Sequence, residues 1–495
     1  MVGEGAPAVP KGIAGVFATR HVAGNGPCAG QFTAFVNGEI ELTLPIARYD
    51  NQSKFKRVTT MNYKMLAGAA CAALTVLAAP VNAASAPSFN MFSQSAGVAS
   101  SQAVDAFYAS RHDAPLWFSQ GPSSPSARAL IGVLRQANLD GLQSGPALAA
   151  QADSLIARAS AGDSQALASA DRLLSNAWVM YVQALQRPPA GMTVADRWAA
   201  PRQQPAQEIL QRAAAADSLA QYVRETSVVN PLYAQLREAA AQQLASGVSP
   251  DARVLASLDR ARTSPIQKKY VIVDAASARL YMIENGRIAD TMRVVVGKPS
   301  APTPMMASTI YYATVNPYWH VTDELVQSLI APNVLKQGVS YLTSHGYQLF
   351  TSYADDAKQL APDKVDWKAV AAGRATVEVR QLPGPANSMG QVKIGFPNAE
   401  DIYLHDTPNK GVFAANDRDL SHGCIRLEDA SRLERWLLGA EAPTSDQPEH
   451  HVLLPTPVPI YITYLTAHGE DGQLTFVDDV YGRDAVGGAV TVAAN

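Results

Sequence analysis

The chain has 495 residues, of which 47% are hydrophobic, and this is enough for several domains with apolar cores. Charged residues make up 17% of the chain and the formal net charge is −3, so the composition excludes a wholly disordered protein. The sequence has no stripe of basic residues of the kind that would indicate a nucleic-acid partner.

An apolar run from Met65 to Val81 follows the basic start at Met61 to Lys64 and ends in small residues at Ala84 to Ala86. This order is typical of a secretory signal peptide, and the run is shorter than the ~20 residues of a membrane span. We predict a signal peptide over residues 61–86, with Met61 as the true start. A buried helix or a membrane anchor is the less favoured alternative for the apolar run. Residues 1–60 are then a non-native or disordered N-terminal extension.

The cysteines are Cys28, Cys71 and Cys424. Removal of the predicted signal peptide leaves Cys424 alone, which excludes an intramolecular disulfide. A lone thiol in an oxidising compartment is a liability unless it is used, so the count favours a nucleophile.

Residues 88–262 are predicted to form an all-α domain. Apolar side chains recur at helical spacing, and prolines interrupt the pattern as expected of a bundle with short connections. The aromatic segment from Phe107 to Phe118 is interpreted as core, with ligand binding as the alternative.

From Tyr270 the pattern alternates with period two, which predicts strands. Asn285-Gly286 indicates a tight hairpin, and Asp471-Gly472 separates two further strands near the end. Other strands are expected over Ser308 to Asn316 and Gln391 to Phe396. The fold class is therefore α+β, with a mainly antiparallel, sandwich-like domain over residues 268–484 and a C-terminal tail at 485–495.

Alternation lapses between Pro332 and Arg380. An insertion of this length in a compact domain is usually functional, so we predict a lid over about 332–380; a tolerated surface loop is the alternative. Beyond Cys424 we expect a helix with Glu428 and Asp429 in its first turn, whose N-terminus would favour the thiolate.

The segment from His405 to Arg426 concentrates the chemistry, with His405-Asp406 followed by SHGCIRL around Cys424. A thiolate needs a base and a partly exposed position, and glycine allows the tight turn that brings backbone N–H groups close to an oxyanion. A buried structural cysteine is the bland alternative. A metal site of His405, His422 and Cys424 lacks the paired spacing of structural zinc and a fourth ligand, so no metal is predicted.

These motifs resemble the catalytic signature of the L,D-transpeptidases, the YkuD-type cysteine enzymes of bacterial cell walls. Further segments carry the resemblance to the large branch with a helical scaffold domain: VVVGKPSAPTP (294–304), NPYWHV (316–321), RQLPGPANSMGQVKIGFPN (380–398) and DDVYGRD (478–484).

The resemblance implies roles for particular residues. Cys424 is the nucleophile, His405 the proton donor and acceptor, and His422 and Gly423 position the cysteine and its oxyanion. Substrate binding is assigned to Ser421, Arg426, Tyr318 and Trp319. A salt bridge from Arg426 to Glu428 or Asp429, and packing of Tyr318 and Trp319, are the alternatives. His345, His450, His451 and His468 are interpreted as surface residues.

The implied function is a periplasmic peptidoglycan L,D-transpeptidase. It would form 3→3 cross-links through a cysteine acyl-enzyme on tetrapeptide stems, with release of D-Ala and no cofactor or metal. Hydrolysis on the same scaffold, as an L,D-carboxypeptidase or endopeptidase, and a non-catalytic wall-binding protein remain alternatives. Expected partners are peptidoglycan stem peptides, with no nucleic acid and no stable membrane span after signal removal.

Overall fold

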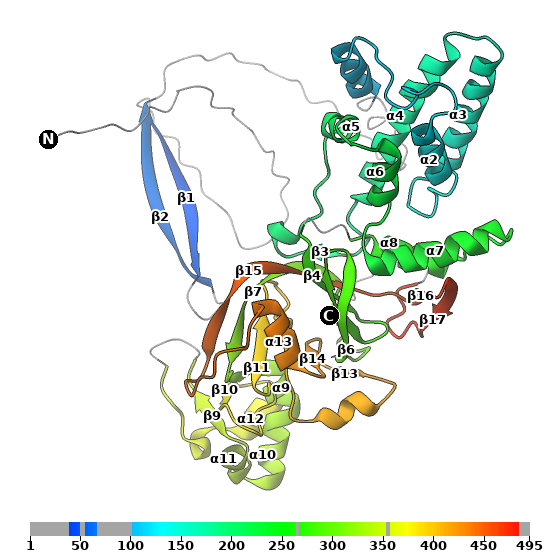
Figure 1. Cartoon of the computed structure of the whole chain (residues 1–495). Helices are drawn as coiled ribbons and strands as arrows, with labels where there is room; N and C mark the ends of the chain where they lie inside the picture. The colour runs from blue at the N-terminus through cyan, green and yellow to red at the C-terminus, as the bar shows by residue number, and fades with distance from the viewer. Residues whose placement is uncertain (1–38, 50–54, 67–100, 264–266, 353–356, 485–495) are drawn as a thin grey trace, which may run out of the picture. The chain divides into compact units, whose positions relative to one another are not determined.

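The computed structural model describes residues 39–49, 55–66, 101–263, 267–352 and 357–484. The chain divides into two compact units, Met1–Ala86 and Pro87–Asn495, whose helices and strands are labelled in Figure 1. Among the described residues, no helix is long and apolar enough to cross a membrane.

The described part of the first unit is an antiparallel hairpin of β1 (Glu39–Tyr49) and β2 (Phe55–Leu66). It falls on residues expected to be a non-native or disordered extension, and that expectation stays a prediction. β2 runs through Met61 into the expected signal peptide, and residues 67–86 of that segment lie outside the described residues.

The second unit begins with the predicted helical region. A helix over residues 101–110 is followed by α2 (Pro125–Leu134), α3 (Gly145–Ser160), α4 (Ala166–Leu185), the short β3 (Thr193–Val194) and η1 (Arg197–Ala199), α5 (Ala206–Ala214), α6 (Leu219–Thr226), α7 (Pro231–Ala245) and α8 (Ala252–Ala261). Trp117 and Trp178 lie edge to face in its core, with ring centroids 6.1 Å apart. The buried Asp171 carboxylate accepts hydrogen bonds from the backbone N–H groups of Leu116, Trp117 and Phe118 at 2.9, 2.8 and 2.9 Å. The aromatic segment is therefore core, as predicted.

The β domain is built on one mixed sheet. Its strands are β4 (Lys269–Asp274), β5 (Arg279–Glu284), β6 (Arg287–Gly297), β7 (Met306–Val315), β11 (Val392–Gly395), β12 (Tyr403–His405), β13 (Asp419–Ser421), β14 (Ile425–Leu427) and β15 (His450–Thr463), with a short η4 (Lys410–Ala414) between β12 and β13. The path β11-β12-β14-β6-β5-β4-β15-β7 closes on itself because β11 also pairs with β7. The α+β class is confirmed, and the strands form a closed ring instead of two separate sheets.

The predicted hairpin at Asn285-Gly286 is confirmed. Both residues have positive φ, 51° and 75°, as a two-residue turn between β5 and β6 requires. Parallel pairs also occur, since β14 lies parallel to β12 and β15 lies parallel to β4. The sheet is thus less uniformly antiparallel than expected.

The ring encloses the core of the domain. Inward side chains such as Val294, Leu404 and Ile425 are buried there, and α13 (Ala430–Leu438) packs Leu433 and Leu437 against them. Because side chains alternate along a strand, the neighbours of Leu404 and Ile425 project from the opposite, outer face.

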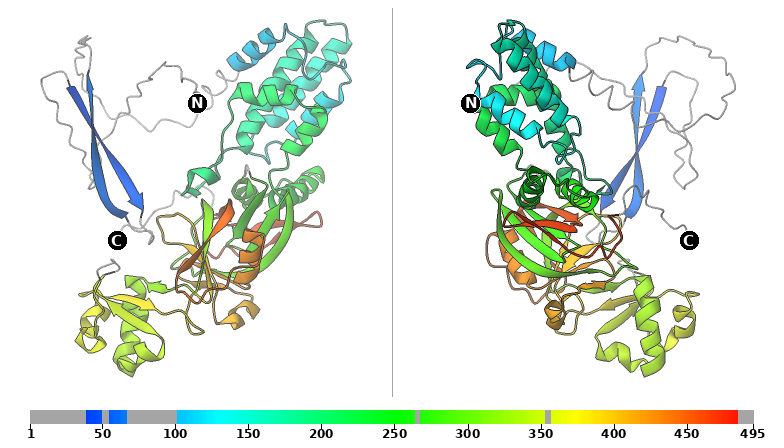
Figure 2. Two further views of the ribbon diagram at one scale, coloured as in Figure 1. Left: turned by 60° about the vertical axis from the view of Figure 1, so that its left-hand side comes forward. Right: turned by 90° about the vertical axis from the view of Figure 1, so that its right-hand side faces the viewer.

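The predicted insertion is a small folded subdomain with its own core. It starts earlier than expected and contains β8 (Trp319–Val321), α9 (Asp323–Leu325), η2 (Val326–Ile330), α10 (Ala331–Gln337), α11 (Ser340–Ser344), β9 (Tyr347–Phe350), η3 (Pro362–Lys364), α12 (Trp367–Ala371) and β10 (Glu378–Gln381). β10 lies between β8 and β9 in a three-stranded sheet, and Figure 2 shows these elements gathered in one lobe. Trp319 and Trp367 are each 7% exposed within its core, so the segment folds around apolar side chains of its own, and its role as a lid stays a prediction.

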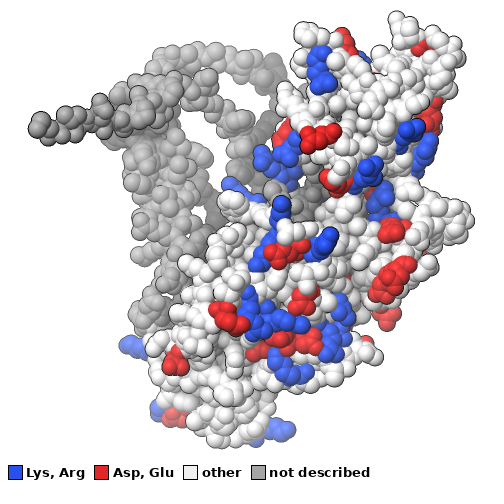
Figure 3. Space-filling model, viewed as in Figure 1, with Lys and Arg blue, Asp and Glu red and all other residues white. Residues whose placement is uncertain are grey.

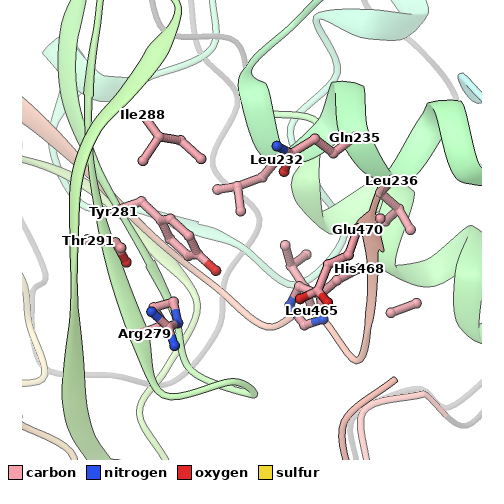
Figure 4. A pocket seen from close by; sticks show the side chains of 12 residues that line it. Leu232, Gln235, Leu236, Arg279, Tyr281, Ile288, Thr291, Leu465, His468 and Glu470 are labelled. Carbon is pink, nitrogen blue, oxygen red and sulfur yellow. The ribbon is translucent and has the colours of Figure 1, made fainter. Parts of the chain in front are cut away.

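Helices α7 and α8 pack against a C-terminal hairpin of β16 (Ala467–Glu470) and β17 (Gln473–Phe476). A cavity of about 250 Å³ lies between α7, β5, β6 and β16. Figure 4 shows Arg279 and Tyr281 on its sheet side and His468 on its hairpin side. His468 is not a surface residue, because its Nε2 lies 2.8 Å from the buried carboxylate of Asp274.

Candidate active site

The turn that carries Cys424 is held by its own side chains. Ser421 Oγ donates a hydrogen bond to the Cys424 carbonyl oxygen at 2.6 Å and accepts one from the Gly423 N–H at 3.2 Å. Gly423 has φ +110°, and a Cβ there would lie 3.0 Å from Ile402 Cδ1. The positive φ therefore favours glycine here, and a Cβ would press against the end of the Ile402 side chain. Ser421 has a positioning role in the turn.

The loop 297–303 is hydrogen-bonded to this turn. Thr303 Oγ1 donates to the Gly423 carbonyl oxygen at 2.7 Å and accepts from the Gly297 N–H at 2.9 Å, and Thr303 is fully buried. The C-terminal motif reaches the same loop, since the Tyr481 hydroxyl donates to the Gly297 carbonyl and the Arg483 guanidinium donates to the Thr303 carbonyl at 3.1 Å. Two segments of the family resemblance thus meet beneath the cysteine.

The strand register brings His405 to the cysteine. In the parallel pair of β12 and β14, Leu404 lies opposite Ile425 and His405 lies opposite Arg426. Leu404 and Ile425 are fully buried in the core, so His405, Arg426 and Cys424 project from the outer face of the sheet. Adjacent strands lie about 4.8 Å apart, which places Cys424 and His405 as diagonal neighbours.

His405 is suited to accept a proton. Its side chain is 3% exposed, and burial, assisted by the positive charges of Arg426 and Lys393, lowers its pKa to about 3. Nδ1 lies 2.6 Å from the Asp406 carbonyl oxygen, which can only accept, so the neutral ring carries its proton on Nδ1. Nε2 then has the free lone pair of a general base.

Cys424 is a thiol in the resting site. Burial raises the pKa of this thiol, while hydrogen bonds from Tyr403 and the charge of Lys393 act in the opposite direction. Sγ lies 3.6 Å from the Asp401 carbonyl oxygen, to which it donates. The resting pair is therefore neutral thiol and neutral imidazole, and the proton must move when substrate is attacked.

The expected helix does not act on the thiol. β14 separates Cys424 from α13, which begins at Ala430 and is capped by the Asp429 carboxylate on the Arg432 N–H at 3.0 Å. A helix was expected here, but it begins after Glu428 and Asp429, which were expected in its first turn, and its dipole acts mainly over the first turn. The short β14 was missed because a three-residue strand has no readable periodicity.

Arg426 does not form the salt bridge to Glu428 or Asp429 that was the alternative to substrate binding. Glu428 pairs with Arg293, and the Asp429 carboxylate lies beside Arg432 at 3.8 Å. Within the described ranges no carboxylate forms an ion pair with Arg426, whose guanidinium lies on the outer face next to His405.

The other predicted residues have contacts of their own. His422 is exposed, and its Nε2 lies 2.9 Å from Lys298 Nζ. Trp319 packs inside the insertion, which agrees with the packing alternative. Tyr318 is half-buried, with the Arg380 guanidinium 4.1 Å from its ring centroid.

Two residues near the sulfur were not predicted. Tyr403 lies on the outer face of β12, and Lys393 Nζ lies 4.6 Å from the centroid of its ring. Tyr403 also packs against the core of the insertion, so the insertion adjoins the catalytic face. Lys393 is the polar member of the alternating VKIG strand, but its place beside His405 depends on strand register. The described residues contain no His, Cys, Asp or Glu group suited to hold a metal ion.

The comparisons with known proteins identify the class. Residues 268–460 match the family model of the L,D-transpeptidase catalytic domain (YkuD), and residues 102–239 match that of the Scaffold domain. These two regions of the chain are therefore similar to an L,D-transpeptidase catalytic domain and to a scaffold domain.

The chain is also similar to individual proteins. An inferred L,D-transpeptidase of Haemophilus influenzae is 27% identical over 393 residues, which cover 76% of this chain and 77% of the relative. An L,D-transpeptidase from Mycobacterium smegmatis is 14% identical, with 40% of this chain and 58% of that structure aligned at a TM-score of 0.20. L,D-transpeptidase 3 from Mycobacterium tuberculosis, in complex with a faropenem-derived adduct, is 11% identical over 40% of this chain and 60% of that structure, also at 0.20.

Proposed function

We propose that this chain is a peptidoglycan L,D-transpeptidase that forms 3→3 cross-links through an acyl-enzyme on Cys424. The observation that carries the proposal is the register of β12 and β14, which puts the Cys424 thiol on the same face of the sheet as a buried His405 whose Nδ1 is bonded to the Asp406 carbonyl oxygen. The matched catalytic domain supports the substrate class.

The first half-reaction acylates the cysteine. His405 Nε2 takes the Cys424 proton as Sγ attacks the carbonyl carbon of the third stem residue. Collapse of the tetrahedral intermediate breaks the peptide bond, and the imidazolium returns the proton to the amine of the departing D-Ala. The products are a thioester and free D-Ala.

The second half-reaction transfers the acyl group. An amine of a second stem loses a proton to His405 as it attacks the thioester, and the released thiolate of Cys424 recovers that proton. The Gly423 N–H is engaged by Ser421 Oγ, so its use as an oxyanion donor requires that this bond yields when the intermediate forms.

Export to the periplasm belongs to the same proposal. It rests on the basic start at Met61, the apolar run and the small residues near Ala84. The reaction needs no cofactor, because both proton transfers use His405 and the nucleophile is a side chain.

Two rivals are separated by one experiment. The mature chain is incubated with purified tetrapeptide-bearing muropeptides, and the products are resolved by mass spectrometry. Cross-linked dimers with free D-Ala support the transferase, whereas tripeptides without dimers assign an L,D-carboxypeptidase. If neither product forms and a carbapenem leaves the protein mass unchanged, the chain is a wall-binding protein and the proposal is wrong.

A further inference from the structure

Three side chains form a row across neighbouring strands on the catalytic face. Lys393 of β11 lies opposite His405 of β12, and His405 lies opposite Arg426 of β14. Partners in register project from the same face of a sheet. The general base is therefore flanked by a cation on each side.

Neither cation is neutralised by the acid that follows β12, Asp406, or by the acid that follows β14, Glu428. Asp406 is held by Lys410 at 2.6 Å, and Glu428 is held by Arg293. No ion pair among the described residues reaches Lys393 or Arg426. Lys393 contacts the ring of Tyr403 instead.

The row is an unusual place for two unpaired positive charges. Both side chains are only partly exposed, and His405 is neutral, so nothing in the row offsets them. A partly desolvated cation gains most from a charge-assisted hydrogen bond to an anion. Positive and negative side chains are interspersed on the face of the molecule that Figure 3 shows.

We propose that Lys393 and Arg426 form a carboxylate-binding subsite around the base, in which Lys393 binds the free carboxylate of the residue that departs when the donor peptide is attacked. This inference rests on the proposed function and restricts which donor peptides the site accepts. The donor must be a peptide with a free carboxylate next to the bond that breaks, and an amide at that position is a poor donor.

Thiol reagents test the charge of the subsite without any peptide. Iodoacetate is anionic and iodoacetamide is neutral, and both alkylate the thiolate of Cys424, so the ratio of their rates cancels any change in thiol pKa. In Lys393→Met, the iodoacetate-to-iodoacetamide ratio should fall by about tenfold, as expected for loss of a charge a few ångströms away. Lys393→Arg should restore the ratio, and Lys364→Met, at an exposed lysine of the insertion, should leave it at the parent's value.

A pair of donors tests what the subsite binds. Lys393→Met should lower kcat/KM for a tetrapeptide donor about tenfold, mainly through KM, while the same donor with its C-terminal carboxylate amidated should react equally slowly with parent and variant. Equal losses for both donors, or an unchanged alkylation ratio, would overturn the subsite. If the ratio falls as expected but neither donor reacts, the subsite stands and the proposed substrate is wrong.

Discussion

His405 and Cys424 have pKa values displaced in directions that keep both neutral. Burial lowers the pKa of His405 to about 3 and raises that of the Cys424 thiol. A thiolate–imidazolium ion pair is therefore disfavoured in the free enzyme, in contrast to cysteine sites where a helix N-terminus or a protonated histidine activates the sulfur.

The pH dependence of alkylation tests this resting state. The rate of Cys424 with iodoacetamide should rise through alkaline pH with an apparent pKa above the ordinary value of about 8.5, because burial penalises the thiolate. A rate that is already at its plateau near pH 6 would contradict the neutral pair.

Acid stability tests the buried imidazole. An unfolded histidine has a pKa of about 6.5, so between that pH and about 3 the unfolded chain binds a proton that folded His405 does not. His405 therefore contributes a loss of unfolding free energy of up to ~1.4 kcal/mol per pH unit as pH falls through this window. Chemical denaturation at pH 7 and pH 5 should show a smaller loss in His405→Gln than in the parent. Equal losses in the two proteins would mean that His405 is not buried as a neutral group.

At the scale of elements, the turn before β14 depends on the loop 297–303 and the C-terminal motif. Thr303 joins both, because it bonds to Gly423 and Gly297 and its carbonyl accepts from Arg483. Loss of one partner of a buried hydrogen bond costs about 1–3 kcal/mol, and here the partner that shifts is the residue next to the nucleophile.

Thr303→Val keeps the shape and removes both hydroxyl bonds. We expect kcat to fall about tenfold or more with KM unchanged, since a misplaced nucleophile slows the chemical step, and Thr303→Ser should recover most of the rate. Asp478→Asn changes an exposed residue of the C-terminal motif and serves as the control. A change in KM with kcat unchanged would assign Thr303 a purely structural role. So would a Thr303→Ser variant that does not recover the rate.

The insertion is one folded element and has to be removed as one. β8 and β10 pair directly, and Asn387 binds the carbonyl oxygens of both flanking segments, Pro317 at 3.0 Å and Leu382 at 2.9 Å. A surface loop could be replaced by a linker over residues 336–376 alone. In this folded subdomain, the same replacement would leave half of an apolar core exposed. A Gly/Ser linker in place of residues 319–381 should keep the β domain folded and shift products from dimer towards hydrolysed tripeptide, because Tyr403 and the thioester lose their cover. An unchanged product ratio at similar rates would show that the subdomain is no lid.

Local patterns predicted several elements and missed the contacts between them. The Asn285-Gly286 turn and α13 follow from turn chemistry and helical periodicity. The pairing of β12 with β14, which brings His405 beside Cys424, joins residues whose register no local pattern encodes. His405 was still predicted, through the resemblance of its motif, whereas Lys393 carries no motif and depends on the register alone.

At the scale of the molecule, the scaffold helices and the β domain are joined by hydrogen bonds and by a common apolar core. Buried Arg260 of α8 binds Asp484 at 2.7 Å and the Tyr464 carbonyl oxygen at 3.2 Å, and Leu465 and Ala467 belong to the helical core. The C-terminal motif therefore links α8 to the loop under Cys424, and the predicted boundary near residue 262 separates chain segments rather than independent bodies.

The start of the native chain is a prediction at the same scale. A gene that begins at Met61 should direct export and give a mature protein starting near Ala84 or Pro87, which N-terminal sequencing of the periplasmic protein measures. Peptides from residues 1–60 in the native protein would show that the hairpin of β1 and β2 is made and that Met61 is not the start.

The acyl-enzyme is the central claim, and intact-protein mass spectrometry tests it most directly. The mature chain is mixed with a tetrapeptide stem and quenched in acid, and its mass is compared with that of Cys424→Ser under the same conditions. We predict a mass increase equal to the tripeptide acyl group, located on Cys424 by peptide mapping, with one free D-Ala per acylated protein and no adduct on the serine variant. An adduct on another residue, or turnover by Cys424→Ser at a rate near the parent's, would contradict the mechanism.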